Sequence, residues 1–184
     1  MKALRLLLLL PLMSMTKCLQ QPAPTFKLPP ATQRGANVIG FVTGGRIWRS
    51  YGEYNYDSTL YGNNLRAYRS RFGNFYLQAR QEAKDVDESL RITLDTLVQV
   101  GTYQFNPRPD VTTSSHISRE LEFMENYRVY SSRANGSTAT LTITSLDTMQ
   151  HIIAGTFSAR LRSTNDTTTR VVTLSDGRFD VRYY

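Results

Sequence analysis

The sequence has few of the residues that build metal sites, disulfides or familiar catalytic centres. Its single cysteine, Cys18, cannot form a disulfide within the chain. Its two histidines, His116 and His151, lack the H-x-x-x-H spacing that brings two ligands to one metal. No G-x-S-x-G motif, phosphate-binding loop or dinucleotide-binding fingerprint is present. We therefore expect no metal, no cofactor and no nucleotide chemistry.

The basic residues do not form a run. The net charge of the whole sequence is +7, and it falls to +4 without the three basic residues that precede Cys18. The arginines of the remaining chain are scattered, whereas nucleic-acid binding requires a basic stripe that tracks phosphates. Nucleic acid is accordingly not expected as a partner.

The first seventeen residues have the pattern of a secretory signal peptide. Lys2 and Arg5 precede an apolar run from Leu6 to Met13. A membrane-spanning helix needs about 20 apolar residues, so this run is too short to cross a bilayer. We assign residues 1–17 to a signal peptide.

Cys18 follows this apolar run at the position where a bacterial lipoprotein signal is cleaved. Such a site would place a diacylglycerol on the thiol and anchor the protein to a membrane by its N-terminus. Lys17 departs from the pattern, because the residue before a lipidated cysteine is usually small. Cleavage elsewhere in the segment and a free thiol without a role are the alternatives.

Residues 18–35 are predicted to form a proline-rich tether. This stretch has four prolines, no acidic residue and little hydrophobic periodicity. We expect it to be a mobile spacer that can be removed without loss of stability. The remaining residues, 36–184, are long enough for one domain with a buried core.

Apolar residues alternate with polar ones through most of the domain, which predicts β-strands with one buried face. The clearest examples are the stretches 75–80, 90–95, 138–144, 153–162, 172–175 and 178–183. Less regular strands are expected at 38–42, 46–51, 65–68, 102–105 and 127–131. Only 118–126 offers a short helical alternative.

Residues that tolerate positive φ lie between or within the predicted strands. We expect Gly44-Gly45, Asn135-Gly136, Asn165-Asp166 and Asp176-Gly177 to form tight turns, with Asp176-Gly177 closing the last hairpin. The predicted fold class is all-β, an antiparallel two-sheet sandwich or barrel-like fold of roughly eight to ten strands, with the sandwich as first choice.

Four segments together resemble an uncharacterised lipoprotein family of Bacteroidota with a β-rich domain. They are the segments 34–40, 44–48, 153–158 and 176–183, which follow a lipoprotein-like signal in that order. The resemblance implies an exported outer membrane lipoprotein and no established activity. In such lipoproteins, acidic residues just after the cysteine accompany export to the cell surface. Here the first acidic residue after Cys18 is Glu53, which implies the periplasmic face.

The densest aromatic group is a candidate binding site for a protein or glycan. Its members are interleaved with amides and charged residues, and they are Trp48, Tyr51, Tyr54, Tyr56 and Tyr61. The simpler interpretation is that Trp48 and some of the tyrosines belong to a strand core and the rest to an ordinary loop.

Two clusters of acidic residues are candidate chemical sites. Glu120, Glu122 and Glu125 include the carboxylate pair that glycoside hydrolysis needs, but also fit a solvated strand face. Asp85, Asp87 and Glu88 could ligate calcium, although a solvated turn is the simpler interpretation.

Three functions are compatible with these observations. The first is a non-enzymatic, lipid-tethered envelope module that binds or scaffolds a partner. The second is a ligand-binding barrel with an aromatic-lined cavity for an apolar or glycan ligand. The third is a glycan-active enzyme that uses the carboxylates of 120–125.

Overall fold

The chain folds into one curled antiparallel sheet whose two halves pack face to face. The computed structural model describes residues 24–52, 64–95, 99–105, 119–164 and 170–184. Those residues form eleven strands: β1 (Val38–Thr43), β2 (Arg46–Arg49), β3 (Leu65–Arg69), β4 (Phe75–Ala83), β5 (Val86–Leu94), β6 (Gly101–Phe105), β7 (Glu120–Glu125), β8 (Arg128–Ser131), β9 (Thr138–Asp147), β10 (Ile152–Ser163) and β11 (Val171–Arg182). The all-β prediction is confirmed, and the region of the helical alternative contains strand β7.

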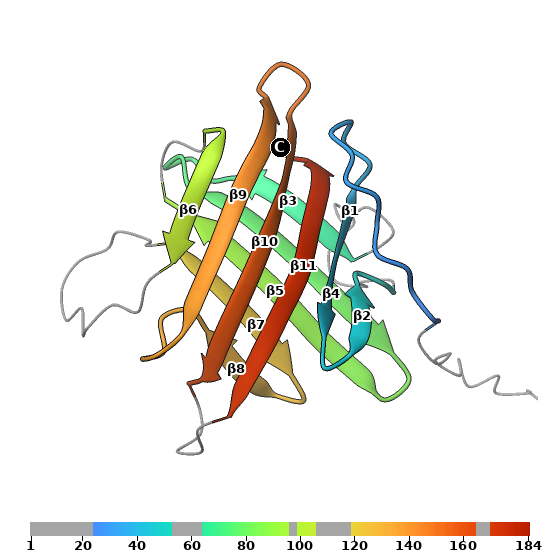
Figure 1. The fold of residues 1–184 in the computed structure, drawn as a ribbon. Coiled ribbons are helices and arrows are strands. Elements are labelled where there is room, and N and C mark those ends of the chain that lie inside the picture. The colour runs from blue at the N-terminus through green and yellow to red at the C-terminus, as the bar shows by residue number, and fades with distance from the viewer. Residues whose placement is uncertain (1–23, 53–63, 96–98, 106–118, 165–169) are drawn as a thin grey trace, which may run out of the picture.

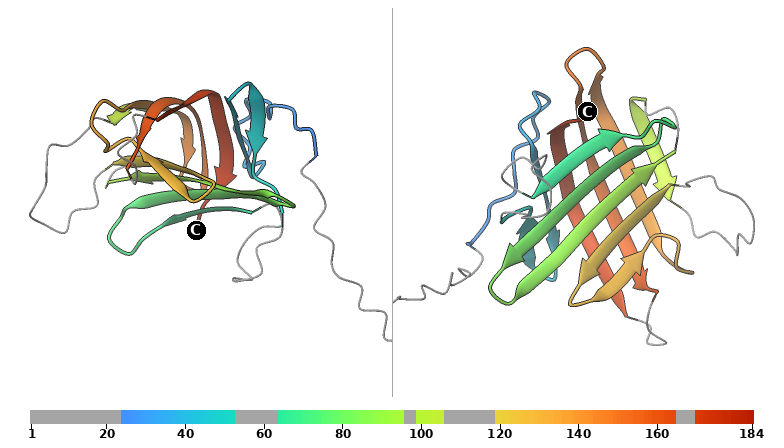
Figure 2. Two further views of the ribbon diagram at one scale, coloured as in Figure 1. Left: turned by 90° about the horizontal axis from the view of Figure 1, so that it is seen from below. Right: turned by 180° about the vertical axis from the view of Figure 1, so that it is seen from behind.

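The strands lie in two layers (Figure 1, Figure 2). The front layer has the order β6-β9-β10-β11-β1-β2, and the back layer has the order β8-β7-β5-β4-β3. Strand β10 joins them, because its first nine residues pair with β9 and its last two pair with β8. Each named strand pair is antiparallel.

Backbone hydrogen bonds also connect the layers on the side opposite the β10–β8 pair. Tyr184, just after β11, accepts from the amide of Arg69 at 2.8 Å and donates to the carbonyl of Ala67 at 3.3 Å. Tyr51, just after β2, exchanges hydrogen bonds with Arg80 and Glu82 of β4. The fold therefore combines the two facing layers of a sandwich with the curled sheet of a barrel.

Apolar side chains fill the space between the layers. The ring of Trp48 is fully buried and stacks on Phe41, with centroids 4.7 Å apart. Phe123 of the back layer and Phe157 of the front layer contact Phe41 edge-on at 5.6 and 5.7 Å. Such interlocking rings bury large apolar areas and drive folding of the two layers onto each other.

Two predicted turns are confirmed, and the hairpin predicted at Asp176-Gly177 is wrong. Gly44 and Gly45 have φ values of 55° and 75° and close the β1–β2 hairpin, as both central residues of a type I′ turn require. The Asn135-Gly136 turn connects β8 and β9, which each pair with β10 instead of with one another. The Asn165-Asp166 prediction lies outside the described residues.

The Asp176-Gly177 pair does not close a hairpin, because β11 runs through it from Val171 to Arg182. Asp176 has a φ of 52° and lies at a bulge where β11 shifts register against β10. A Cβ atom on Gly177 would come within 2.6 Å of Phe157, so glycine permits the close approach of that ring. The positive φ was predicted correctly, but it serves a bulge.

The described part of the expected tether is docked on the front layer, and we call residues 24–37 the N-terminal strap. Its anchor is Asp180 of β11, whose buried carboxylate accepts bonds from the Thr32 hydroxyl at 2.6 Å and the backbone amides of Arg34 and Gly35 at 3.1 and 2.7 Å. Pro29 is buried over Gly40. The expectation of a mobile spacer therefore does not apply to residues 29–35.

Candidate functional site: a polar groove on the back layer

The aromatic residues predicted as a binding group do not form one exposed site among the described residues. Trp48 belongs to the core, so its ring is not accessible to a ligand. Tyr51 is half-buried and packs against Phe26 of the strap, with ring centroids 5.6 Å apart. Tyr54, Tyr56 and Tyr61, as well as Cys18 and His116, lie outside the described residues.

A groove of about 410 Å³ lies on the outer face of the back layer. Outward side chains of four strands line it in two rows. Arg66, Gln78, Arg91 and Glu122 lie side by side on β3, β4, β5 and β7, because the strand register pairs each with the next. Asn64, Arg80, Ser89 and Met124 form the second row. With strands about 4.8 Å apart, each row spans roughly 14 Å.

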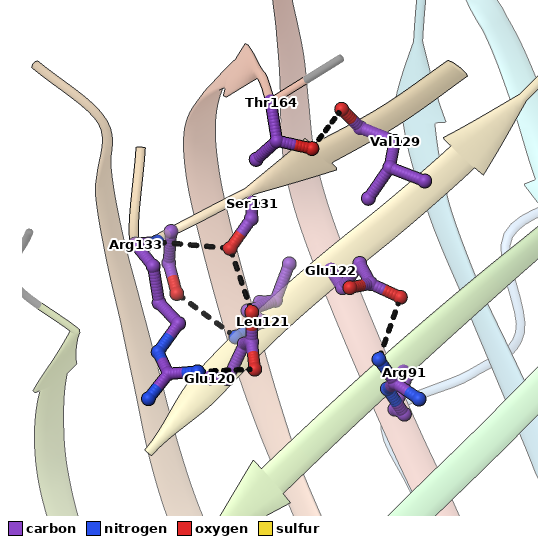
Figure 3. A network of polar contacts seen from close by, with 9 residues as sticks. Arg91, Glu120, Leu121, Glu122, Val129, Ser131, Arg133 and Thr164 are labelled. Carbon is purple, nitrogen blue, oxygen red and sulfur yellow. Dashed lines mark hydrogen bonds and ion pairs between the residues drawn. The ribbon is translucent and has the colours of Figure 1, made fainter. Parts of the chain in front are cut away.

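Ion pairs hold two of the groove's arginines in place. The guanidinium of Arg80 bonds both oxygens of Asp87 at 2.8 Å. Arg91 bonds Glu122 at 2.9 Å across β5 and β7 (Figure 3). Such pairs at the surface contribute little stability, about 0–1 kcal/mol, but they orient long side chains that would otherwise be free.

Asn64 lines the groove, and a hydrogen bond holds its side chain in place. The residue is 4% exposed, and its side-chain amide donates to the carbonyl of Tyr51 at 3.0 Å. This bond fixes the orientation of the amide group. The other end, Oδ1, has no hydrogen-bond partner within the described part of the chain, and it is shielded from solvent.

A cluster of tyrosines borders one end of the groove. The rings of Tyr68 and Tyr76 stack at 4.9 Å, and Tyr184 stacks on the other side of Tyr68 at 6.2 Å. Arg66 lies over the rings of Tyr68 and Tyr184, and its Nε donates to the Tyr184 hydroxyl. Burial raises the pKa of Tyr68 more than the neighbouring guanidinium of Arg66 lowers it. The Tyr68 phenol is thus protonated at neutral pH.

Each carboxylate of β7 pairs with a basic side chain. Glu120 accepts from the Ser131 hydroxyl at 2.8 Å and pairs with Arg133 at 3.6 Å (Figure 3). Glu122 is paired with Arg91, and Glu125 pairs with Arg46 at 3.3 Å. Such pairing is typical of a solvated strand face.

The acidic residues around the β4–β5 turn have different surroundings and partners. Asp85 lies in the turn, Asp87 binds Arg80, and the buried Glu88 pairs with Arg46 at 2.6 Å. Within the described ranges, no group of three or more His, Cys, Asp or Glu residues could hold a metal ion. His151 is exposed in the β9–β10 turn.

A ligand-filled barrel is not favoured by the packing between the layers. The space where such a ligand would lie is occupied by Phe41, Trp48, Phe123 and Phe157, whose rings contact one another. The described strands and loops include no helix that is long and apolar enough to span a membrane.

Sequence reasoning identified the alternation that turns Gln78, Arg80 and Arg91 outward, but it did not recognise the groove. A period of two indicates which residues share a strand face, whereas the register between strands decides which of them become neighbours. The tyrosine cluster was missed for the same reason, because Tyr184 is more than one hundred residues from Tyr76 in the chain.

Comparisons with known proteins add no relative from which to transfer a function. No family model matches the sequence, and no curated protein or solved structure is significantly similar to it.

Proposed function

We propose that this chain is a lipid-anchored, non-enzymatic binding module of the cell envelope and that the groove on the back layer is its binding face. The groove carries the proposal because it combines pre-oriented polar side chains with an aromatic border. Pre-orientation lowers the entropy that binding must otherwise cost. The ion pairing of each β7 carboxylate favours binding over catalysis.

The anchoring part of the proposal rests on the sequence. A signal-like segment leads to Cys18, and the docked strap begins a few residues later, with Phe26 already packed against Tyr51. Eight residues of extended chain reach at most about 28 Å. An acylated Cys18 would therefore hold the domain close to the membrane surface. The absence of acidic residues shortly after Cys18 supports the periplasmic face of the outer membrane.

Membrane anchoring is tested by fractionation. Cys18→Ser should move the full-length protein from the membrane to the soluble fraction, and mass spectrometry of the wild-type N-terminal peptide should detect the acyl chains. A Cys18→Ser protein that still requires detergent for extraction contradicts lipid attachment. Protease shaving of intact cells tests the side, because digestion of the domain without rupture contradicts the periplasmic assignment.

The binding face is tested by site-specific crosslinking in intact cells. A photo-crosslinking residue in place of Ser89, which lines the groove between Arg80 and Met124, should form a discrete adduct. The same residue in place of Thr156, which is exposed on the front layer, is the matched control. An adduct at position 89 alone supports the proposal, whereas no adduct, or equal adducts at both positions, contradicts it.

A further inference from the structure

We infer that the groove binds an uncharged saccharide chain lying across strands β3, β4, β5 and β7. The inference depends on the proposed binding function and names the class of ligand. It is carried by the charge balance of the groove, its pattern of donors and acceptors, and the tyrosine border.

The positive charges of the groove are balanced only when the carboxylates beside it are counted. Its lining includes Arg66, Arg80, Arg91 and Glu122. Glu122 pairs with Arg91, and Arg80 pairs with Asp87 and Glu82, which lie beside the groove and not in its lining. Three positive and three negative groups leave no net charge among these described residues. An anionic ligand would have to compete with the carboxylates, so the electrostatic gain expected of a phosphate or sulfate site is small.

The same pairs suit a ligand rich in hydroxyl groups. Each sugar hydroxyl both donates and accepts, and the first row presents donors on Arg66 and Arg91, an amide on Gln78 and an acceptor on Glu122. Hydrogen bonds to ionised groups are stronger than those between neutral groups, which compensates for the loss of water from the hydroxyls.

The border of the groove offers apolar surface beside these polar rows. Tyr184 is 46% exposed and lies next to Arg66, and Met124 lines the opposite side of the groove. Aromatic rings with a polar tip suit the mixed apolar and polar faces of a pyranose ring. The groove thus places apolar and polar surface side by side, as a pyranose ring does.

A peptide that adds a strand does not fit this location. Strand addition requires unpaired backbone groups at the edge of a sheet. The floor of the groove is the face of paired strands, whose backbone groups already bond to their neighbours in β3–β4, β4–β5 and β5–β7. The ligand must therefore be recognised by side chains alone.

The test is affinity electrophoresis of the full-length protein in a polyoxyethylene detergent, which has no sugar headgroup to compete. Dextran, laminarin, xylan and mannan are the neutral probes, and polygalacturonate and heparin are the acidic probes. We expect retardation by at least one neutral polysaccharide, changing less than about twofold between roughly 50 and 500 mM NaCl because charge attraction is not its source.

Gln78→Ala and Arg91→Gln should each weaken that binding about tenfold, as expected for loss of a charge-assisted or buried hydrogen bond. Thr156→Ala is the matched control and should leave binding unchanged, and thermal melting establishes that each variant is folded. Binding to acidic probes alone, no retardation by the neutral probes, or neutral binding that survives both groove variants overturns the inference.

The crosslinking experiment distinguishes failure of the saccharide inference from failure of the proposed binding function. A position-89 adduct that contains protein and no carbohydrate contradicts the saccharide and leaves the binding face intact. The absence of any position-specific adduct contradicts both proposals.

Discussion

The outer faces of the two layers are built on the same alternating pattern, yet they present different chemistry. The back layer exposes arginines, carboxylates and tyrosines around the groove. The front layer exposes hydroxyls and amides from β6, β9 and β10, which we call the hydroxyl face: Thr102, Gln104, Thr138, Thr140, Thr142, Thr144, Thr156 and Ser158. Its contacts are neutral, such as Thr102 to Thr142 at 3.1 Å and Thr140 to Gln104 at 2.8 Å.

The two faces also differ in what lies beside them. The N-terminal strap borders the hydroxyl face, where Gln33 donates to Thr144 at 3.3 Å and Ala31 lies beside Thr140. The strap contributes to stability through a buried anchor, whereas the groove has solvent-exposed ion pairs of small energetic weight. We therefore expect the front layer to govern stability and the back layer to govern binding.

The largest expected effect is the loss of the strap's anchor. Asp180→Ala leaves the Thr32 hydroxyl and the amides of Arg34 and Gly35 without their acceptor. The free energy of unfolding of the full-length protein, measured by urea denaturation, should fall by about 3 kcal/mol. Asp95→Ala removes an exposed partner of Arg119 and should cost less than about 1 kcal/mol. Equal costs for the two substitutions would show that the strap is not an anchor of the fold.

A smaller effect is expected from acid. Burial alone raises the pKa of Asp180, but hydrogen bonds from Thr32, Arg34, Gly35 and Ala36 outweigh it and hold the pKa below its ordinary value of 3.8. The stabilisation is therefore complete above that ordinary value and is lost as the pH falls through the lower pKa of the folded state. The stability difference between wild type and Asp180→Asn should be constant from neutral pH to about pH 5 and shrink below about pH 4. A difference that grows on acidification contradicts this.

On the back layer, the groove's ion pairs should contribute little to stability. Arg80 and Asp87 are 31% and 37% exposed, so solvent screens their attraction. A double-mutant cycle with Arg80→Ala and Asp87→Ala should give a coupling energy of roughly 0.5 kcal/mol. A coupling above about 2 kcal/mol would make the pair a structural element and weaken the contrast between the two layers.

The smallest effect is expected on the hydroxyl face itself. Thr142→Val keeps the branched shape that suits a strand and removes only the exposed hydrogen bond to Thr102. Unfolding free energy should change by less than about 0.5 kcal/mol. Saccharide retardation should also stay the same. A weakened retardation would place the binding site on the front layer.

Much of the strand content could be predicted because burial imposes alternation. Phe75, Leu77 and Ala79 point inward, as their spacing indicates, and Trp48 is a core residue. The Asp176-Gly177 pair was misassigned because a residue that tolerates positive φ, as Asp176 does here, fits a bulge as well as a hairpin. Local residue preferences cannot distinguish them, since only the partner strands show whether the chain turns back.

The strap illustrates a different reason for failure. Residues 29–35 have no periodic pattern, so nothing in their own sequence indicates contact with the sheet. Their binding depends on Asp180, almost 150 residues away, whose carboxylate accepts from backbone amides that every residue type except proline possesses. Asp180 determines where the strap binds. The alternating pattern of β11 does not indicate that this carboxylate contacts a distant segment.

By itself, the sequence determined the all-β class, the inward and outward faces of most strands, the Gly44-Gly45 hairpin and the signal-like segment before Cys18. These are local properties, set by the period of two and by residues that allow positive φ. Only the tertiary structure decided that β10 joins two layers, that Asp180 binds the strap, and that Arg66, Gln78, Arg91 and Glu122 form one row. Each of these depends on strand register and on contacts between distant segments, which local preferences do not specify.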